Sequence, residues 1–182
     1  MQSQPHRYLI LVLAAVLLVS RAAPQQRSNK RTVSADGLYS FHLPASWSID
    51  VNEPQRLSIA NCARSDVAEG GLLPPNGAAI IVAKAPAQVK NVEEWRQRAD
   101  PDAHLISDLQ VPCPAGAKNK RDCVQREVRT EMAPGVFYRI VTIYFSIKGH
   151  LLRATLVLNE AYPNVDKSRR AFNEFLSSIN PG

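Results

Sequence analysis

Residues that could carry catalysis or bind a metal are few in this sequence and stand far apart. His42, His104 and His150 are the histidines that follow the apolar N-terminal segment, and no two of them have the spacing of a metal site. The sequence contains neither the Gly-x-Ser-x-Gly motif of α/β-hydrolases nor a glycine-rich phosphate-binding loop. We therefore expect no catalytic residue, no bound metal and no cofactor.

Carboxylates that could act as a general acid and base are also poorly placed. Glu127 and Glu131 fall on one face of a predicted strand, but Arg129 stands between them. Alternating charge of this kind is typical of a solvated, ion-paired sheet face. An enzyme would need a nonstandard site, for which Cys62 and His42 are the candidates.

Four other side chains point to binding rather than catalysis. Strand periodicity places Arg129, Tyr138, Tyr144 and Arg153 on one polar face of a predicted sheet. Tyrosine and arginine are enriched among the residues that dominate the binding energy of protein interfaces. If the face is open, it can bind a protein or a glycan. In the alternative, the N-terminal segment or the helix that carries Trp95 covers it.

The first 22 residues have the pattern of a cleavable export signal. Arg7 gives the start a positive charge, Leu9–Val19 is an unbroken apolar run, and small residues precede a cleavage point after Ala22. The run is too short to cross a bilayer. We expect residues 1–22 to be removed and the mature chain to be periplasmic or secreted, without a stable membrane span. The alternative is an uncleaved anchor.

The charge of the mature chain argues against one class of partner. Removal of residues 1–22 leaves 20 basic and 16 acidic residues, a net charge of +4, with the basic residues spread from Arg27 to Arg170. Nucleic-acid binding usually needs a concentrated basic stripe. We therefore expect no nucleic-acid partner.

Export would allow the three cysteines to form a disulfide, because disulfides form in oxidising compartments. Cys113 and Cys123 flank a polar segment, and the strands predicted on either side bring them together. A bridge between them closes a loop of about 11 residues and contributes about 2–3 kcal/mol to stability. Cys62 is then a buried thiol, a reactive thiol or the true partner of one of the other two.

The mature chain divides into a flexible tether, residues 23–37, and a single strand-rich domain, residues 38–180. Alternating apolar residues predict the first strands, 62–77 is a long aperiodic loop, and the apolar run Ala78–Ala83 predicts a central strand. Asn91 and Glu94 have the spacing of a capping box at the start of a short helix. The shorter predicted strands fall at 39–43, 47–51, 57–59 and 105–111.

Three consecutive strands, Cys123–Met132, Val136–Ile147 and Leu151–Asn159, form a predicted antiparallel meander with turns at Pro134-Gly135 and Lys148-Gly149. Two-residue turns put the apolar residues of all three strands on one face, which a one-residue slip would expose. The expected pairs are Phe145 with Leu152, Ile143 with Ala154, Val141 with Leu156, Met132 with Phe137, Val128 with Val141, and Val124 with Phe145.

The chain ends in a predicted amphipathic helix that covers the apolar face of the meander, with Asn164 or Asp166 as its cap. Its buried stripe consists of residues at helical spacing: Val165, Ser168, Phe172, Phe175, Leu176 and Ile179.

The segment Tyr39–Trp47 resembles the aromatic-x-Phe-x-x-Pro-x-x-Trp signature of the PsbP-like superfamily, and Tyr162–Ile179 is similar to that family's C-terminal helix. The resemblance covers roughly residues 37–179. It implies an α+β fold: an antiparallel sheet of about six to seven strands flanked by helices on both sides, an α/β/α sandwich. The family includes extrinsic photosystem II subunits, a Ran-binding protein, secretion-effector chaperones and unassigned exported bacterial proteins. The leader favours the last group, and no functional residue is carried over.

The sequence therefore favours an exported, non-enzymatic domain that binds another envelope or secreted protein. The alternatives are a carrier of a small ligand or lipid, and an enzyme with a nonstandard site.

Overall fold

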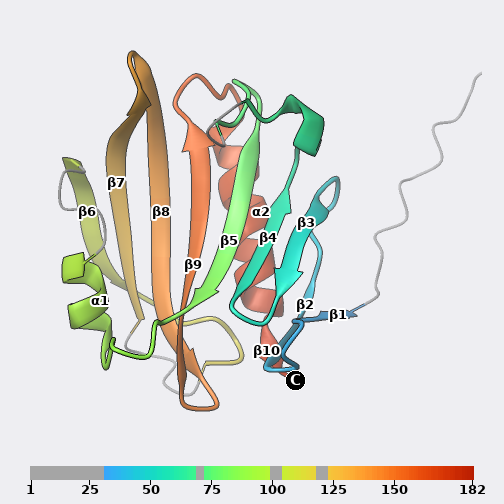
Figure 1. Ribbon diagram of the computed structural model, residues 1–182, viewed down its shortest axis with the longest axis vertical. Helices are drawn as coiled ribbons and strands as arrows, with labels where there is room; N and C mark the ends of the chain where they lie inside the picture. Colours follow the sequence, from blue (N-terminus) through green and yellow to red (C-terminus); the bar gives the residue numbers. More distant parts are fainter. Residues whose placement is uncertain (1–30, 69–71, 99–103, 118–122) are drawn as a thin grey trace, which may run out of the picture.

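Seven antiparallel strands form one large sheet in the order β3-β4-β5-β9-β8-β7-β6 (Figure 1). The computed structural model describes residues 31–68, 72–98, 104–117 and 123–182. The number of strands agrees with the prediction, and β5 lies inside the sheet as expected. The strands are β3 (Ser48–Glu53), β4 (Arg56–Ala60), β5 (Ala78–Lys84), β6 (His104–Val111), β7 (Cys123–Ala133), β8 (Val136–Ile147) and β9 (His150–Asn159).

A second, three-stranded sheet joins the two ends of the described chain. Its strands are β1 (Arg31–Val33), β2 (Tyr39–His42) and β10 (Asn180–Pro181), with β2 in the middle. Residues 31–37 were predicted to belong to a flexible tether. They form β1 and a turn instead, because β1 finds hydrogen-bonding partners along β2. The expected signal segment and the rest of the tether, residues 1–30, lie outside the described residues.

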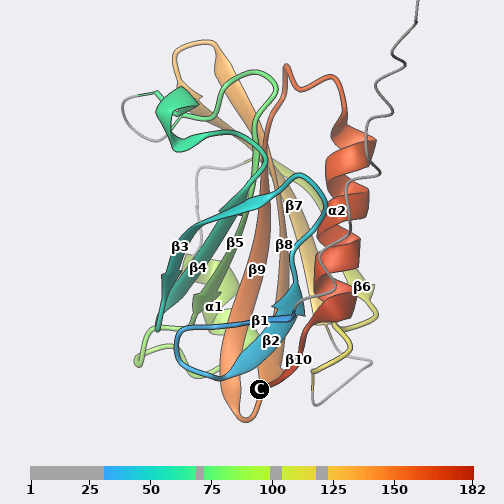
Figure 2. The ribbon, with the colours of Figure 1, turned by 90° about the vertical axis from the view of Figure 1, so that its right-hand side faces the viewer.

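Two helices lie on opposite faces of the large sheet, as Figure 2 shows. The longer helix, α2 (Val165–Ser178), packs along one face, and the short helix α1 (Val92–Arg98) lies against the other. The Asn91 side chain accepts a hydrogen bond from the Glu94 N–H at 2.8 Å, as the capping pattern predicts. Asn164 precedes α2 but makes no side-chain capping bond.

The main core lies between α2 and the sheet. The predicted apolar stripe of α2 is buried there, and Phe175 meets Phe41 of β2 edge to face with ring centroids 5.4 Å apart. Both rings are completely buried. Phe175 thus joins the helix to the small sheet as well as to the large one.

Strand pairing confirms one half of the predicted meander and corrects the other. Phe145 pairs with Leu152, and the rest of the β8–β9 register is as expected. The predicted β7–β8 pairs are wrong by one residue: Val128 faces Ile140 rather than Val141, and Val124 faces Tyr144 rather than Phe145. The predicted pairing of Met132 with Phe137 is wrong too, because Glu131 takes that place. The cause is a β-bulge at Met132, which adds one residue to β7 beside the Pro134-Gly135 turn.

The bulge sends the charged residues of β7 to a different face from the one expected. Glu127 lies on the α2 face, where it is buried. Its carboxylate accepts a hydrogen bond from Arg169 of α2 at 2.7 Å and lies 3.6 Å from Arg139 of β8. This carboxylate therefore acts as a link between the sheet and α2 rather than as part of a solvated face.

The predicted disulfide between Cys113 and Cys123 is present, with the two Cα atoms 5.1 Å apart. It joins the segment that follows β6 to the first residue of β7. Cys62 is a free, half-buried thiol.

A partly buried ion pair fixes the turn between β1 and β2. The carboxylate of Asp36 contacts the Lys84 ammonium of β5 at 2.5 Å and accepts hydrogen bonds from the Ser34 hydroxyl and the Leu38 N–H. Burial acts to raise the pKa of Asp36, but these bonds outweigh it and lower the pKa to about 2. The small sheet is thereby attached to the large one.

We expect Phe175→Ala to lower the free energy of unfolding by about 3–5 kcal/mol, because it removes a fully buried ring from the junction of α2 with both sheets. Chemical denaturation followed by circular dichroism measures the change. Glu174→Ala, at the next and exposed position of α2, is the control and should change stability by less than about 0.5 kcal/mol. Equal effects of the two substitutions would contradict this role of Phe175.

Asp36 should make stability depend on acidity. Its pKa is lower in the folded protein than the usual 3.8, so its contribution is present above about pH 4 and is lost as the pH falls towards 2. We expect Asp36→Asn to be less stable than the natural protein at neutral pH, with the difference shrinking in acid. Denaturation curves between neutral pH and about pH 2.5 measure this. The control is Glu174→Gln, and a difference that does not change with pH would contradict the account.

Candidate functional site

The face of the large sheet opposite α2, here called the open face, carries two adjoining hollows. The larger has a volume of about 500 Å³ and the smaller about 250 Å³. Ile81 of β5 and Val157 of β9 line both, so the two hollows adjoin, and together they are called the groove. Their combined size falls within the roughly 300–1,000 Å³ typical of ligand sites.

Strand register sorts the side chains of the groove into three neighbouring rows that run across the strands. One row is apolar, the middle row is rich in hydroxyl groups, and the third carries aromatic and cationic groups. The apolar row is Val128, Ile140, Val157 and Ala79; the middle row is Arg126, Thr142, Thr155, Ile81 and Ser58; the third row includes Tyr144, Arg153 and Arg56.

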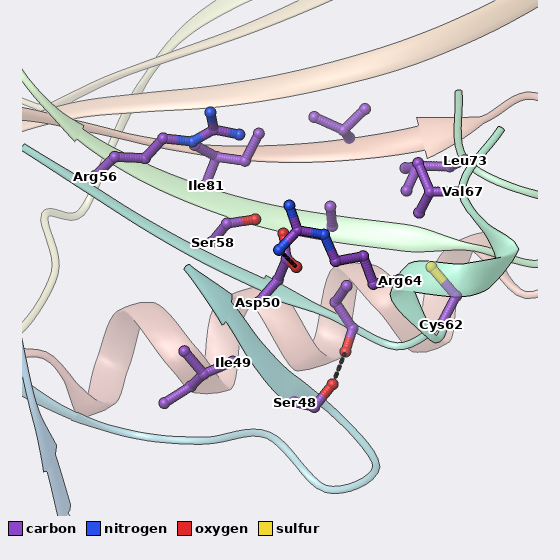
Figure 3. A pocket seen from close by; sticks show the side chains of 13 residues that line it. Ser48, Ile49, Asp50, Arg56, Ser58, Cys62, Arg64, Val67, Leu73 and Ile81 are labelled. Atoms are coloured by element: carbon purple, nitrogen blue, oxygen red, sulfur yellow. Dashed lines mark hydrogen bonds and ion pairs between the residues drawn. The ribbon is translucent and has the colours of Figure 1, made fainter. Parts of the chain in front are cut away.

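Positive charge dominates the groove. Five arginines line it, and Asp50 is the one carboxylate among the described lining residues. Asp50 already faces Arg64 at 3.6 Å, and their side chains point toward one another in Figure 3. Arg98 is bound to Glu94 of its own helix at 2.6 Å. The other three arginines are Arg56, Arg126 and Arg153. No carboxylate of the described residues lies within 4 Å of their guanidinium groups.

The middle of the groove offers hydrogen-bond donors. The hydroxyls of Thr142 and Thr155 lie 3.2 Å apart, and since only one proton is used between them, the other remains for a ligand. Burial raises the pKa of Tyr144, and the nearby charges of Arg153 and Arg126 oppose that shift. Tyr144 is therefore a neutral donor at physiological pH. Donors beside guanidinium groups suit a ligand that carries negative charge.

Helix α1 closes one end of the groove. Trp95 packs edge-on against Tyr144 with ring centroids 5.7 Å apart, and the Arg153 guanidinium lies 5.3 Å from the centroid of the Trp95 ring. An ion pair between Arg96 and Asp108 attaches the helix to β6. Trp95 thus holds Arg153 beside the groove through a cation–π contact.

The described residues of the long loop predicted at 62–77 form the other wall. Val67 and Leu73 line the smaller hollow. The Tyr138 hydroxyl donates to the Leu73 carbonyl at 3.0 Å, and the Asn159 amide lies 3.4 Å from the same oxygen. Two side chains of the sheet therefore hold the loop in place beside the groove.

The four residues predicted to form an interaction face are only partly brought together. Tyr144 and Arg153 line the larger hollow, whereas Tyr138 is buried and holds the loop. Arg129 lies on the α2 face, where its guanidinium stacks over Phe137 and its Nε donates to Glu160 at 2.9 Å.

Sequence reasoning missed the arginines that replace Arg129 in the groove. Arg126 alternates along β7 with Val124 and Val128, and all three lie on the same face of the sheet. Arg126 was assigned to no face from the sequence, because the bulge at Met132 was not predicted. Arg98 comes from α1 and Arg64 from the short 3-10 helix Arg64–Asp66. Only the position of these two helices on the sheet reveals their role.

The residues considered for a nonstandard enzyme site, Cys62 and His42, lie in different parts of the fold. Burial raises the pKa of Cys62, and Asp66 and Asp50 raise it further, which disfavours the reactive thiolate. His42 lies in the small sheet, where its ring accepts a hydrogen bond from Arg31 at 3.3 Å. His104 and His150 are exposed.

Among the described residues, no three histidine, cysteine or acidic side chains lie close enough together to hold a metal ion. Neither helix in the described ranges is long and apolar enough to cross a membrane.

No family model matches the chain, and no curated protein matches it. Solved structures do. The Ran-binding protein Mog1p of Saccharomyces cerevisiae aligns with a TM-score of 0.55 at 11% identity, over 84% of this chain and 94% of that one. LpqN, which is involved in cell envelope biogenesis of Mycobacterium tuberculosis, aligns with a TM-score of 0.54 at 10% identity, over 84% and 90%.

Cyanobacterial PsbP from Synechocystis aligns with a TM-score of 0.49 at 14% identity, over 84% of this chain and 92% of that one. The chain spans 48% of the length of a Bacteroides thetaiotaomicron structure that it also matches, at 12% identity and a TM-score of 0.48. The alignments with Mog1p and LpqN confirm the α+β fold that the resemblance implied, and at 10–11% identity the likeness is one of fold alone.

Tyr138→Phe should loosen the loop wall without unfolding the domain. The change removes one hydrogen bond to Leu73, which is worth about 0.5–1.5 kcal/mol. We expect faster hydrogen exchange in residues 72–77, measured by mass spectrometry. Tyr39→Phe, which removes a hydroxyl from the small sheet, is the control. Unchanged exchange in the loop of the Tyr138 variant would contradict the role given to this bond.

Proposed function

We propose that this chain is an exported, non-enzymatic binding domain that takes another envelope or secreted protein on the open face of its large sheet. The observation that carries the proposal is the groove itself. Apolar side chains, hydroxyl donors and arginines converge in it, and α1 and the long loop enclose it at two ends. Convergence of these groups in one concave site is typical of binding surfaces.

The residues of the groove also suit protein recognition in particular. Tyr144, Arg126 and Arg153 belong to the residue types that dominate interface energies. Arg153 is preorganised by its contact with Trp95, so less side-chain entropy is lost when a partner binds. A rigid sheet further limits the cost of ordering the site.

Two observations outside the groove support the rest of the proposal. The apolar segment Leu9–Val19, with Arg7 before it and a small-residue cleavage point after it, supports export. The disulfide between Cys113 and Cys123 supports an oxidising compartment. Of two proteins whose fold it shares, Mog1p is a Ran-binding protein and LpqN is involved in cell envelope biogenesis. Neither description is that of an enzyme, although at this identity the likeness extends to the fold alone.

A second candidate function is a carrier of a small ligand or lipid. The volume of the larger hollow, about 500 Å³, favours it, because a single small molecule could fill that space. The same hollow would then be occupied when the protein is purified from its host.

The test is to block the groove and follow the partner. Full-length protein with a C-terminal tag is captured from the host envelope fraction, alongside Thr155→Trp, which fills the larger hollow with an indole ring. We expect a stoichiometric partner with the natural protein and at least about a tenfold loss with the variant. Glu174→Trp places the same ring on the exposed side of α2 and should retain the partner.

Each other result counts against a stated part of the proposal. A partner that stays bound to a folded Thr155→Trp protein would show that the open face is not the binding site. A preparation without a protein partner, in which native mass spectrometry finds a small molecule that Thr155→Trp loses, would replace the proposal by the carrier function. Tagged protein that remains with the cytoplasmic fraction would contradict export.

A further inference from the structure

The three rows of the groove differ in chemistry from one edge to the other, and this pattern has a counterpart in an extended polypeptide. Side chains of an extended segment point alternately to two sides, with neighbours on one side about 7 Å apart. A segment laid across the strands would direct one set of side chains to the apolar row and the other to the arginines. The pattern of the groove thus specifies a pattern in its partner.

Charge decides which polar residues the partner carries. Arg126 on β7 and Arg153 on β9 stand on either side of β8 and in neighbouring rows, so their backbones are about 12 Å apart. Both side chains are long and flexible enough to meet carboxylates on alternate residues of a segment between them. Guanidinium groups bind carboxylates through paired, charge-assisted hydrogen bonds, while a lysine-rich segment would be repelled.

Apolar contacts determine the other set of residues that the partner carries. Ile140, Val157 and Ile81 are only partly buried at the floor of the groove. Aliphatic side chains of a partner would remove these surfaces from water. A sugar–phosphate backbone offers charge without such side chains, so the apolar row favours a polypeptide.

We infer that the partner presents an extended segment in which acidic and aliphatic residues alternate, and that the acidic residues bind Arg126 and Arg153 while the aliphatic residues pack on Val157, Ile140 and Ile81. The inference rests on the proposed function and specifies the chemistry of the partner.

Synthetic peptides of about eight residues, long enough to cross the groove, test it. Three peptides alternate valine with glutamate, glutamine or lysine, and calorimetry measures their binding to the purified protein. We expect the glutamate peptide to bind at least about tenfold more tightly than the glutamine peptide, with no binding of the lysine peptide. Affinity for the glutamate peptide should fall as salt is raised.

Charge reversal locates the contact. Arg126→Glu and Arg153→Glu should each weaken the glutamate peptide by about tenfold or more. Arg170→Glu makes the same change at an exposed position of α2 and should leave the affinity unchanged. Circular dichroism checks that all three variants are folded. Equal binding of the glutamate and glutamine peptides, or equal effects of the three reversals, would overturn the inference.

Two further outcomes separate this inference from the proposed function. If Thr155→Trp still releases a captured protein partner while the peptides fail to bind, the open face is the binding site and the acidic segment is wrong. If the protein instead binds phosphatidylglycerol vesicles in a manner that needs Arg126 and Arg153, the occupant is an anionic membrane surface and the inference is overturned.

Discussion

Side chains of a β-strand alternate between the two faces of its sheet, and in this protein the sequence of each strand must suit both faces. Along β8 and β9, one set of residues packs beneath α2 and the other set forms the floor of the groove. The register of each strand therefore fixes the core and the open face together. A slip of one residue would place Ile143 on the groove side and Thr142 in the core.

The outcome of the sequence predictions follows the same constraint. The β8–β9 register was predictable because the turn at Lys148-Gly149 is short and the apolar alternation is strict on both of its sides. The β7–β8 register was not, because the bulge at Met132 shifts the pairing while the residues around it, Glu131 and Ala133, carry no marker of a bulge. That shift exchanges Arg129 for Arg126 on the open face, so an error of one position changed the predicted site.

The strand-rich order, the short helix and the buried stripe of α2 all arise from local patterns, and the sequence predicts them well. Contacts between distant segments are different. Nothing near Tyr138 in the sequence indicates that its hydroxyl holds Leu73, and nothing near Arg153 indicates the ring of Trp95. The walls of the groove depend on such contacts, which explains why its floor was easier to predict than its boundary.

The small sheet has a mechanical consequence. β1 and β10 flank β2 on opposite sides, so the first and the last described strands are held by one four-residue strand. Tension applied through the N-terminal segment enters β1 and is resisted first by its hydrogen bonds to β2. The strands beneath the groove carry that load only after the hydrogen bonds between β1 and β2 have broken. A pull on the N-terminal end therefore leaves the groove intact until β1 detaches from β2.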